Sequence, residues 1–414
     1  MKSKIGSVDR FERPKWLFNI FILGVILIMY KSQSLMFVRP IPESVIYLFG
    51  VVVSVLYVSF HSLILKKVTP LIFLCLCLIV GIYSYDLLFV NRITLLGIII
   101  SFCSILCAST VLILPTTAKR KLLIIFTKAT SILVLISLVG WILFLLKIPL
   151  PHYTNTSHPY YIHTLYYLFN LNGYPEMQII PRFAGMFLEP GHLGTMCTFL
   201  LYINKFNLRN VLNIALLLGV LLSFSLAGYG LLVGAAALHF YNNGKKGLLI
   251  AGCIIFVLIG AGSAIYNNGD NPLYQLIFQR LEMNDDGEIE GNNRTSKVFD
   301  RAYDRYLESD RIWLGYGRDS LGSAEDGSTS LTIGCATYKR YFFLRGVIGS
   351  SLIILLLGIY LCKYPSKYTV GFAIVYVVAN MIRDYPAEPI WLYLYFLALP
   401  ILKSKRYEIS PSLS

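Results

Sequence analysis

Long apolar runs recur along the whole chain, and they restrict the folds open to it more than any other feature. Each run is close to the twenty residues that a helix needs to cross roughly 30 Å of hydrocarbon. Backbone inside lipid must satisfy its own hydrogen bonds, and a helix does so within one segment. We therefore predict an all-α, polytopic membrane protein of about twelve transmembrane helices, at 16–32, 44–65, 70–90, 93–115, 122–147, 186–203, 209–223, 225–241, 248–266, 341–362, 368–382 and 388–403.

The composition agrees with this class. Apolar residues make up 56% of the 414 residues and charged residues only 14%, whereas a soluble domain carries about 25% charged residues. The first run follows a basic stretch but lacks a small-residue cleavage site, so we predict an anchor rather than a removable signal peptide. The seventh and eighth runs meet at SFSLAGYG, 223–230, where a single broken helix would reduce the count to eleven.

The basic residues predict the orientation. With a cytoplasmic N-terminus, nineteen lysines and arginines fall in cytoplasmic segments, and four, Lys31, Arg39, Arg92 and Arg383, fall in short loops on the other side. This asymmetry is the one that the positive-inside rule describes. It places both termini in the cytoplasm and accounts for most of the net charge of +14, so nucleic-acid binding need not be invoked.

Two connections are far longer than neighbouring helices require, and they organise the chain. Five spans in 1–147 precede a first loop at 148–185, four spans in 186–266 precede a larger loop at 267–340, and three spans and a tail occupy 341–414. An even number of spans separates the two loops, so both should emerge on the extracytoplasmic side. Loops of this length are usually functional or disordered, and the larger one holds 13 of the 22 acidic residues.

The inventory of motifs points away from metals and cofactors. The chain has no HExxH, no CxxC pair, no Walker A sequence and no DxD doublet, and the acidic pair at Asp285 and Asp286 stands alone. Seven of the eight cysteines lie in predicted spans, where cysteine behaves as a small apolar residue. We predict a site without metal or cofactor.

The stretch RFAGMFLEPGHLGT, Arg182–Thr195, places ionisable residues at the start of the sixth run. On one continuous helix, Arg182, Glu189 and His192 would share a face. Pro190 permits a second interpretation, in which Glu189 caps a helix of about 14 residues, or roughly 21 Å. Such a helix is too short to span alone, so the backbone before it would lie against protein or a water-filled cavity. Both interpretations place the three residues at a polar outer cavity; an interfacial cluster that marks the helix end is the alternative.

The larger loop carries a set of arginines at Arg280, Arg294, Arg301, Arg305, Arg311 and Arg318. We predict a surface helix over 295–310, with Thr295 as N-cap and Val298, Ala302 and Tyr306 along one face. Guanidinium groups bind phosphate in a bidentate manner. Neighbouring aspartates leave open a second interpretation, that these arginines form solvated salt bridges.

Two motifs resemble the integral-membrane O-antigen polymerases (Wzy-type), within the wider O-antigen ligase/polymerase superfamily. RFAGMFLEPGHLGT is similar to the Arg-x-x-Gly…Glu-Pro-Gly entry to a mid-chain span. The second motif runs from NNR at 292–294, through WLGYGRDS at 313–320, to RGVIG at 345–349. Ligases of the superfamily carry a histidine before the Gly-x-x-Gly pair, and Cys335 stands at that position here. This departure favours polymerase over ligase and leaves the general base open.

The resemblance implies that a growing glycan is transferred from undecaprenyl diphosphate to an acceptor repeat unit at the periplasmic face of the bacterial inner membrane. Under it, Arg182 and Arg294, supported by Arg301 or Arg305, would bind the diphosphate. Glu189 would be the base, with His192 as the second candidate. A chain-length regulator and the flippase of the pathway are the implied protein partners, and membrane lipid surrounds the chain.

Two alternatives remain open. The first is an O-antigen ligase that transfers finished polymer to lipid A-core. The second is a lipid-linked oligosaccharide flippase or another transporter, for which charges at mid-membrane and short loops would be expected. The sugars, the linkage, and the choice between O-antigen and another surface polysaccharide are not readable from these residues.

Overall fold

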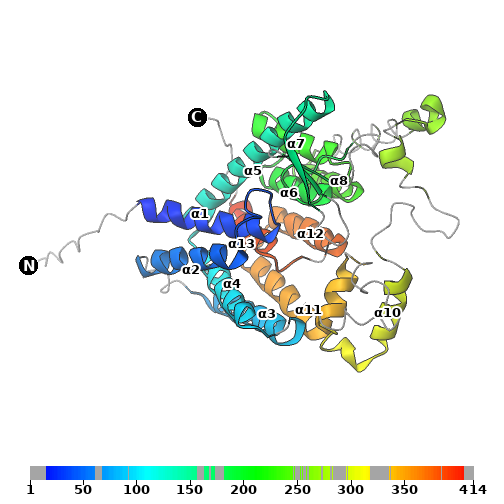
Figure 1. Ribbon diagram of the computed structural model, residues 1–414. Helices are drawn as coiled ribbons and strands as arrows, with labels where there is room; N and C mark the ends of the chain where they lie inside the picture. The colour runs from blue at the N-terminus through cyan, green and yellow to red at the C-terminus, as the bar shows by residue number, and fades with distance from the viewer. Residues whose placement is uncertain are drawn as a thin grey trace, which may run out of the picture.

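The fold is that of a computed structural model, which describes residues 15–60, 68–91, 93–155, 163–166, 169–172, 181–245, 261–271, 274–279, 297–317, 337–383 and 385–404, with single residues at 247, 252, 254, 258, 282, 295 and 335. The described residues are mainly helical. Figure 1 shows the helices gathered into one bundle, with α10 at its lower right. The principal helices are α1 (Lys15–Ser32), α2 (Glu43–Phe60), α3 (Pro70–Tyr85), α4 (Leu95–Ile113), α5 (Thr116–Leu145), α6 (Pro190–Ile203), α7 (Val211–Leu222), α8 (Leu226–Asn242), α10 (Lys297–Leu307), α11 (Tyr338–Lys363), α12 (Lys367–Ile382) and α13 (Pro389–Lys403).

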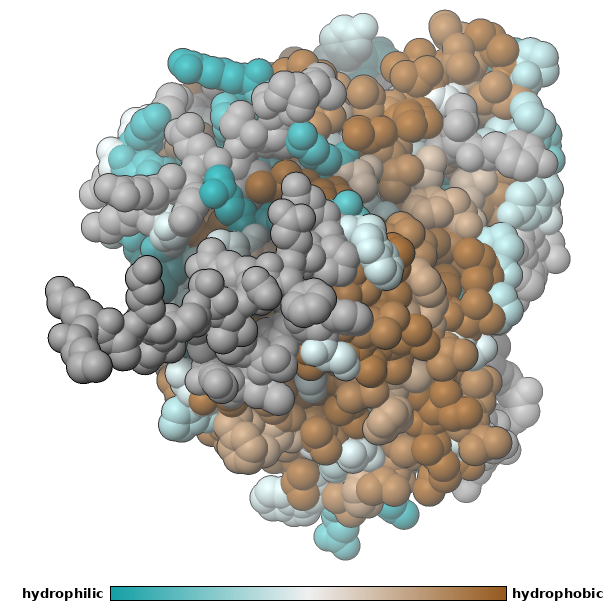
Figure 2. Space-filling view, turned by 90° about the vertical axis from the view of Figure 1, so that its left-hand side faces the viewer, coloured by the Kyte–Doolittle hydropathy of each residue, from teal (hydrophilic) through white to brown (hydrophobic). Residues whose placement is uncertain are grey.

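Four helical segments are long and apolar enough to cross a membrane: Pro70–Val90, Leu95–Ile113, Thr116–Leu145 and Tyr338–Lys363. Five shorter apolar helices accompany them. Large apolar side chains face outward; Phe73 is 63% exposed and Leu95 is 76% exposed. Figure 2 shows such side chains covering a broad, continuous area of one face. An apolar surface of this extent suits a protein embedded in a membrane.

Two helices form the centre of the bundle. Every residue of α6, and every residue of α13 from Pro389 to Leu402, is buried. Rings from α6, α12 and α13 pack together there, with Phe199 5.5 Å from Phe372 and 5.8 Å from Trp391 between centroids. Short helices of this kind can lie at membrane depth because protein, rather than lipid, surrounds their ends.

Contacts between helix ends define two opposite ends of the bundle. At one, which we call the ion-pair end, Tyr83 of α3 donates to the Ala387 carbonyl at 3.4 Å and Ile390 N donates to Ser32 of α1 at 3.2 Å. At the other, which we call the lysine-rich end, Lys119 donates to the Leu112 carbonyl at 2.7 Å and to Tyr360 at 2.8 Å. Lys363, Lys367 and Lys403 also make their contacts at the lysine-rich end.

The first loop contains a small sheet that the all-α prediction omits. Strands β1 (His152–Asn155), β2 (His163–Tyr166) and β3 (Phe169–Asn172) pair antiparallel in the order β1-β2-β3. The sheet packs on the end of α5, where the ring of Phe169 lies 6.1 Å from that of Phe144. Strands of four residues are too short for alternation to distinguish them from loop in a tyrosine-rich sequence.

Helix α10 confirms a helix in the larger loop and corrects its details. It begins at Lys297 rather than 295, and Thr295 forms a bridge with Cys335 instead of capping the helix. Val298 is 58% exposed, and the buried face consists of Phe299, Ala302, Tyr303 and Tyr306. The aromatic residues determine which side is buried because they remove the most apolar surface from water.

The seventh and eighth apolar runs form two helices, α7 and α8, separated by Ser223–Ser225. Phe224 adopts φ 44 in this break, and Ser225 caps α8 by accepting from Gly228 N at 3.3 Å. Helix α7 has 12 residues, or about 18 Å at 1.5 Å per residue. The backbone between α7 and α8 is therefore not one continuous helix.

Candidate functional site

The backbone at Glu189 follows the second interpretation of the entry sequence. Glu189 is the N-cap of α6, with extended φ and ψ of −134° and 144°, and the 14-residue helix begins at Pro190. Proline suits the first helical turn because its missing N–H would have no helical partner there. Arg182, Glu189 and His192 therefore do not share the face of one continuous helix.

The residues before Glu189, 181–188, form a non-helical entry segment that packs against protein. Asn170 of β3, which is 1% exposed, holds this segment by donating from Nδ2 to the carbonyls of Phe187 at 3.1 Å and Leu188 at 3.2 Å. Its backbone N donates to Gly185 O at 2.8 Å. Gly185 has φ 56, a left-handed conformation that glycine adopts without strain. The small sheet thus positions the start of α6.

Glu189 forms an ion pair with Arg383, which follows the last residue of α12. Arg383 Nη1 donates to Glu189 Oε2 at 2.8 Å, and the two side chains are 6% and 24% exposed respectively. Gly191 makes this approach possible, because a Cβ at that position would lie 2.1 Å from Arg383 Nη2. The Glu-Pro-Gly sequence therefore supplies a carboxylate, a helix start and room for a guanidinium.

His192 lies in the first turn of α6 and is 6% exposed. Its ring meets that of Tyr385 edge-on, with centroids 5.6 Å apart. Tyr385 belongs to the connection between α12 and α13, which also carries Arg383. The structure therefore brings Glu189 and His192 to the same connection.

A second Glu-Pro pair starts the other central helix. Glu388 is the N-cap of α13 and Pro389 its first residue. The Glu388 carboxylate accepts a hydrogen bond from Gln33 Nε2, just beyond α1. Neither Glu189 nor Glu388 caps its own helix with its side chain, whereas the N-caps of α3, α4, α7, α8, α11 and α12 do: Thr69, Thr94, Asn210, Ser225, Thr337 and Ser366. Both glutamates instead face residues that follow the ends of other helices, Gln33 after α1 and Arg383 after α12.

A further ion pair connects α3 to α11. Arg345 donates from Nε and Nη2 to the two carboxylate oxygens of Asp86, each at 2.7 Å. The Arg345 guanidinium also lies 4.2 Å from the centroid of Tyr341. Asp86 begins a π-helical turn, Asp86–Val90, at the end of α3; such turns occur frequently at functional sites. Two arginine–carboxylate pairs thus occupy the ion-pair end.

The glycines of the second motif fit closely against backbone. Gly346 has φ 63 and interrupts α11, and a Cβ there would lie 2.5 Å from Trp313 O. A Cβ at Gly315 would lie 2.4 Å from Leu344 O, and one at Gly349 would lie 2.5 Å from the Tyr85 ring. The sequences WLGYG and RGVIG are therefore two sides of one close contact between the larger loop and the bundle.

Helix α10 is held on this contact by its aromatic face. The Tyr306 hydroxyl shares its one proton between Phe342 O at 3.0 Å and Ile312 O at 3.3 Å, and its ring lies 5.1 Å from that of Phe343. Burial raises the pKa of Tyr306, and the neighbouring Tyr303 raises it further. Tyr306 therefore stays protonated at physiological pH and keeps donating these bonds.

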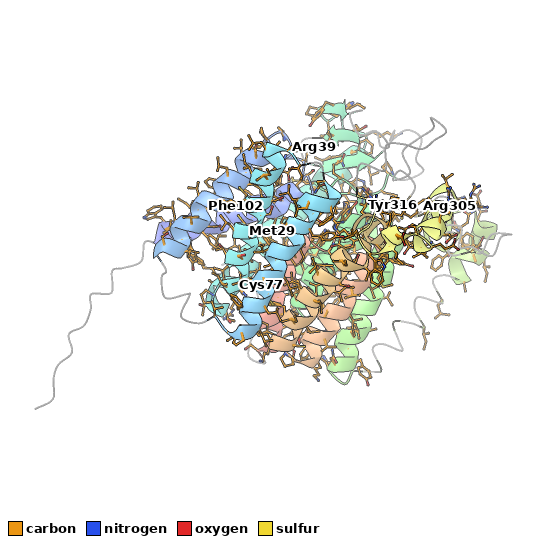
Figure 3. All side chains as sticks on the ribbon, turned by 90° about the horizontal axis from the view of Figure 1, so that it is seen from below. Met29, Arg39, Cys77, Phe102, Arg305 and Tyr316 are labelled. Atoms are coloured by element: carbon orange, nitrogen blue, oxygen red, sulfur yellow. The ribbon has the colours of Figure 1, made fainter. Side chains whose placement is uncertain are left out.

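The predicted diphosphate ligands lie in different places. Arg182 precedes α6, is partly buried and donates from Nε to Ser223 O at 3.3 Å, which places it at the break between α7 and α8. Arg301 and Arg305 are exposed on α10 and donate to carbonyls of that helix, Lys297 O and Arg301 O. Figure 3 shows Arg305 on the side of α10 away from Tyr316, at the edge of the molecule. Arg294 lies outside the described residues.

Sequence reasoning did not select Arg383, Arg345, Asp86, Glu388 or Asn170 for the site. One signal was present: PAEP at 386–389 repeats the Glu-Pro of LEPG at 188–191. Arg383 was also one of only four basic residues assigned to the short outer loops. For Asp86 and Arg345, 259 residues apart, we find no local pattern that predicts their pairing.

The described residues contain no group of three or more histidine, cysteine, aspartate or glutamate side chains that could hold a metal ion. No protein-family model, no curated protein and no solved structure matches the chain.

Proposed function

We propose that the chain is a metal-independent glycosyltransferase that polymerises lipid-linked O-antigen, or related surface polysaccharide, repeat units. It moves the growing glycan from undecaprenyl diphosphate onto an acceptor repeat unit at the outer face of the cytoplasmic membrane. The proposal includes about twelve transmembrane helices, with both termini in the cytoplasm and the active site on the periplasmic side. The resemblance of the two sequence motifs to the Wzy-type polymerases is its starting point.

One observation carries the proposal: Glu189 and Arg383 form an ion pair at the start of a central helix too short to span alone. Ionisable residues at such depth are costly and are usually functional. The carboxylate side chain is 24% exposed, so it can meet a substrate from outside. Phosphate-bearing substrates and a sugar hydroxyl need a cation and a base, respectively.

The reaction balances with these groups. The bond between the anomeric carbon of the growing chain and the diphosphate oxygen breaks, and its electron pair leaves with undecaprenyl diphosphate. The acceptor hydroxyl oxygen bonds to the anomeric carbon, and its proton passes to the Glu189 carboxylate. A positioned carboxylate in this role contributes about 10²–10⁴-fold to the rate, and fixed cations stabilise the charge on the departing diphosphate.

Arg182, Arg294, Arg301 and Arg305 remain the proposed diphosphate ligands, and His192 remains the second candidate for the base. The exposure of Arg301 and Arg305 supports a role in meeting a mobile, membrane-anchored substrate. The partners in this proposal are lipid-linked oligosaccharides, membrane lipid, a chain-length regulator and the flippase of the same pathway.

The lysine-rich end supports the proposed orientation. Lys119, Lys363, Lys367 and Lys403 make their contacts there, and basic residues are enriched on the cytoplasmic side of membrane proteins. The opposite, ion-pair end would then face the periplasm, where the lipid-linked repeat units are presented.

The test is complementation of a strain that lacks the gene. Glu189→Gln and Arg182→Ala, each checked for membrane expression, should leave core plus one repeat in place of the ladder of long glycans. Lys147→Asn serves as a charge-matched control; Lys147 is exposed and has φ 57, a conformation that asparagine tolerates well. It should give a wild-type ladder.

Normal ladders from both Glu189→Gln and Arg182→Ala would overturn the assignment of these residues. Bare core without any repeat in the deletion strain would identify a ligase instead. A ladder that persists in the deletion strain would remove the proposed function altogether.

A further inference from the structure

The start of α6 carries an excess of positive charge. A helix N-terminus is equivalent to about +0.5 elementary charge. Arg383 Nη2 adds a cation there, because it lies only 2.1 Å from the position that a Cβ of Gly191 would take. A cation at this end of a helix is unfavourable, so the arrangement needs an anion. Glu189 is the anion that the structure pairs with Arg383.

The two partners of this ion pair differ in their exposure to solvent. The Arg383 side chain is 6% exposed, and the Glu189 side chain is 24% exposed. The guanidinium is thus enclosed, while the carboxylate lies on the more open side of the pair. An incoming anion would meet Glu189 first and Arg383 behind it.

Arg383 also has unused bonding capacity. A guanidinium has five N–H donors in a planar fork that matches phosphate oxygens. Nη1 donates to Glu189, whereas Nε is buried and has no hydrogen-bond partner among the described residues. A buried donor without a partner is costly, and a ligand with several oxygens could accept from Nε and from the parallel Nη2–H donor beside it.

We propose that Arg383 and the start of α6 form an exchangeable anion site, which Glu189 occupies in the free protein and a substrate diphosphate takes over. Arg383 is thereby added to the diphosphate ligands, and Glu189 is released when the diphosphate arrives. The identity of the occupant rests on the proposed function; the existence of the site does not.

This exchange would couple binding of the donor to activation of the base. While Glu189 Oε2 accepts from Arg383 Nη1, that oxygen is occupied. Once the diphosphate binds Arg383, the carboxylate oxygen becomes able to accept the proton of the acceptor hydroxyl. The base would then be available only when a leaving group is in place.

The test uses the purified full chain in detergent micelles, with inorganic pyrophosphate as the probe and the thermal unfolding midpoint as the readout. Glu189→Gln keeps the shape of the side chain but removes the competing internal charge. We expect this variant to have a lower midpoint than wild type without ligand. We also expect pyrophosphate to raise its midpoint more than that of wild type, with at least tenfold tighter apparent binding.

Arg383→Lys provides the opposite arm, because lysine keeps the charge but loses the fork of donors. We expect it to lose at least tenfold in pyrophosphate affinity. The control Lys147→Asn removes one exposed positive charge and should bind pyrophosphate like wild type. An equal loss of pyrophosphate affinity in Arg383→Lys and Lys147→Asn would mean that pyrophosphate is attracted nonspecifically, and it would contradict the proposed anion site.

Other outcomes are equally decisive. If Glu189→Gln binds pyrophosphate no better than wild type, Glu189 is not an internal competitor and the proposal fails. A midpoint shift produced by phosphatidylglycerol micelles but not by pyrophosphate would assign the site to a lipid headgroup and overturn the diphosphate assignment. Tighter pyrophosphate binding by Glu189→Gln together with a normal glycan ladder would keep the anion site while rejecting Glu189 as the base of the proposed polymerase.

Discussion

At the scale of single residues, the candidate site depends on the absence of a side chain. Gly191 is the second residue of α6, and any Cβ there would lie 2.1 Å from Arg383 Nη2. Its importance comes from this close approach rather than from its backbone conformation. The ion pair of Glu189 and Arg383 is therefore specified by three residues, of which the glycine has no functional group.

We expect Gly191→Ala to displace Arg383, break the ion pair and destabilise the protein by about 1–3 kcal/mol, the usual cost of overpacking a filled site. The measurement is the thermal or denaturant midpoint in detergent, together with the glycan ladder in cells, which should be lost. Gly230→Ala in α8 is the matched control, because no atom lies within 4 Å of its Cβ position. That change should be neutral or stabilise by about 0.5–1 kcal/mol; equal effects from both would contradict the argument.

At the scale of elements, α11 shows how the larger loop is attached to the bundle. Gly346 interrupts the helix with φ 63, which lets the turn at Trp313–Gly315 approach its backbone. Ile348 N donates to Trp313 O at 3.1 Å and Tyr316 N donates to Phe343 O at 2.9 Å across this contact. The Asp86–Arg345 pair lies one residue away from the interruption. The motif RGVIG is therefore the place on α11 where the segment that carries α10 packs against the bundle.

We expect Gly346→Ala to destabilise the protein by about 2–3 kcal/mol, since its φ of 63 and ψ of −171 lie in a region that is essentially restricted to glycine and costs other residues about 1–3 kcal/mol, and its Cβ would meet Trp313 O at 2.5 Å. Limited proteolysis should then cut the larger loop faster than in wild type. Gly358→Ala lies in the same helix with no atom within 4 Å of its Cβ position and should leave the cleavage rate unchanged. An unchanged cleavage rate in Gly346→Ala would contradict the claim that this contact attaches the larger loop to the bundle.

At the scale of the whole molecule, the two ends of the bundle differ in charge chemistry. The ion-pair end contains both arginine–carboxylate pairs, and the lysine-rich end contains lysines bound to carbonyls and hydroxyls. The outward-facing apolar side chains between them suit a lipid environment. This separation is what an orientation across a membrane would require.

We expect a labelling experiment to show that orientation. In a variant whose eight native cysteines are replaced, Thr154→Cys on the exposed side of β1 should react with a membrane-impermeant maleimide added to whole cells with a permeable outer membrane. Asn243→Cys, at the exposed end of α8, should react only after the inner membrane is opened. The reverse pattern would invert the proposed topology.

The parts of the fold and of the candidate site that could be predicted are those that depend on residues close together in the sequence. One of the two predicted alternatives has Glu189 as the N-cap of a helix that begins at Pro190, and the structure has this arrangement. It could be predicted because a proline restricts the backbone of the turn in which it lies. On α10, Ala302 and Tyr306 are buried as predicted, whereas Phe299 is buried in place of Val298, because its ring packs against Phe343. For Arg383 the sequence predicts only a position in an outer loop, because its partner lies 194 residues away in the chain.

The amino-acid sequence alone predicts that the chain is mainly helical, that it has long apolar helices suited to a membrane, and that ionisable residues gather before α6. These features follow from the length of the apolar runs and from the effect that each residue has on the conformation of its own backbone. Both effects act over short stretches of sequence. The contacts of Glu189 with Arg383, of Asp86 with Arg345 and of Asn170 with the entry segment follow from the packed structure and not from any local pattern. Those contacts join segments far apart in the chain, and burying a charge or a polar group requires a partner that only the packed bundle can supply.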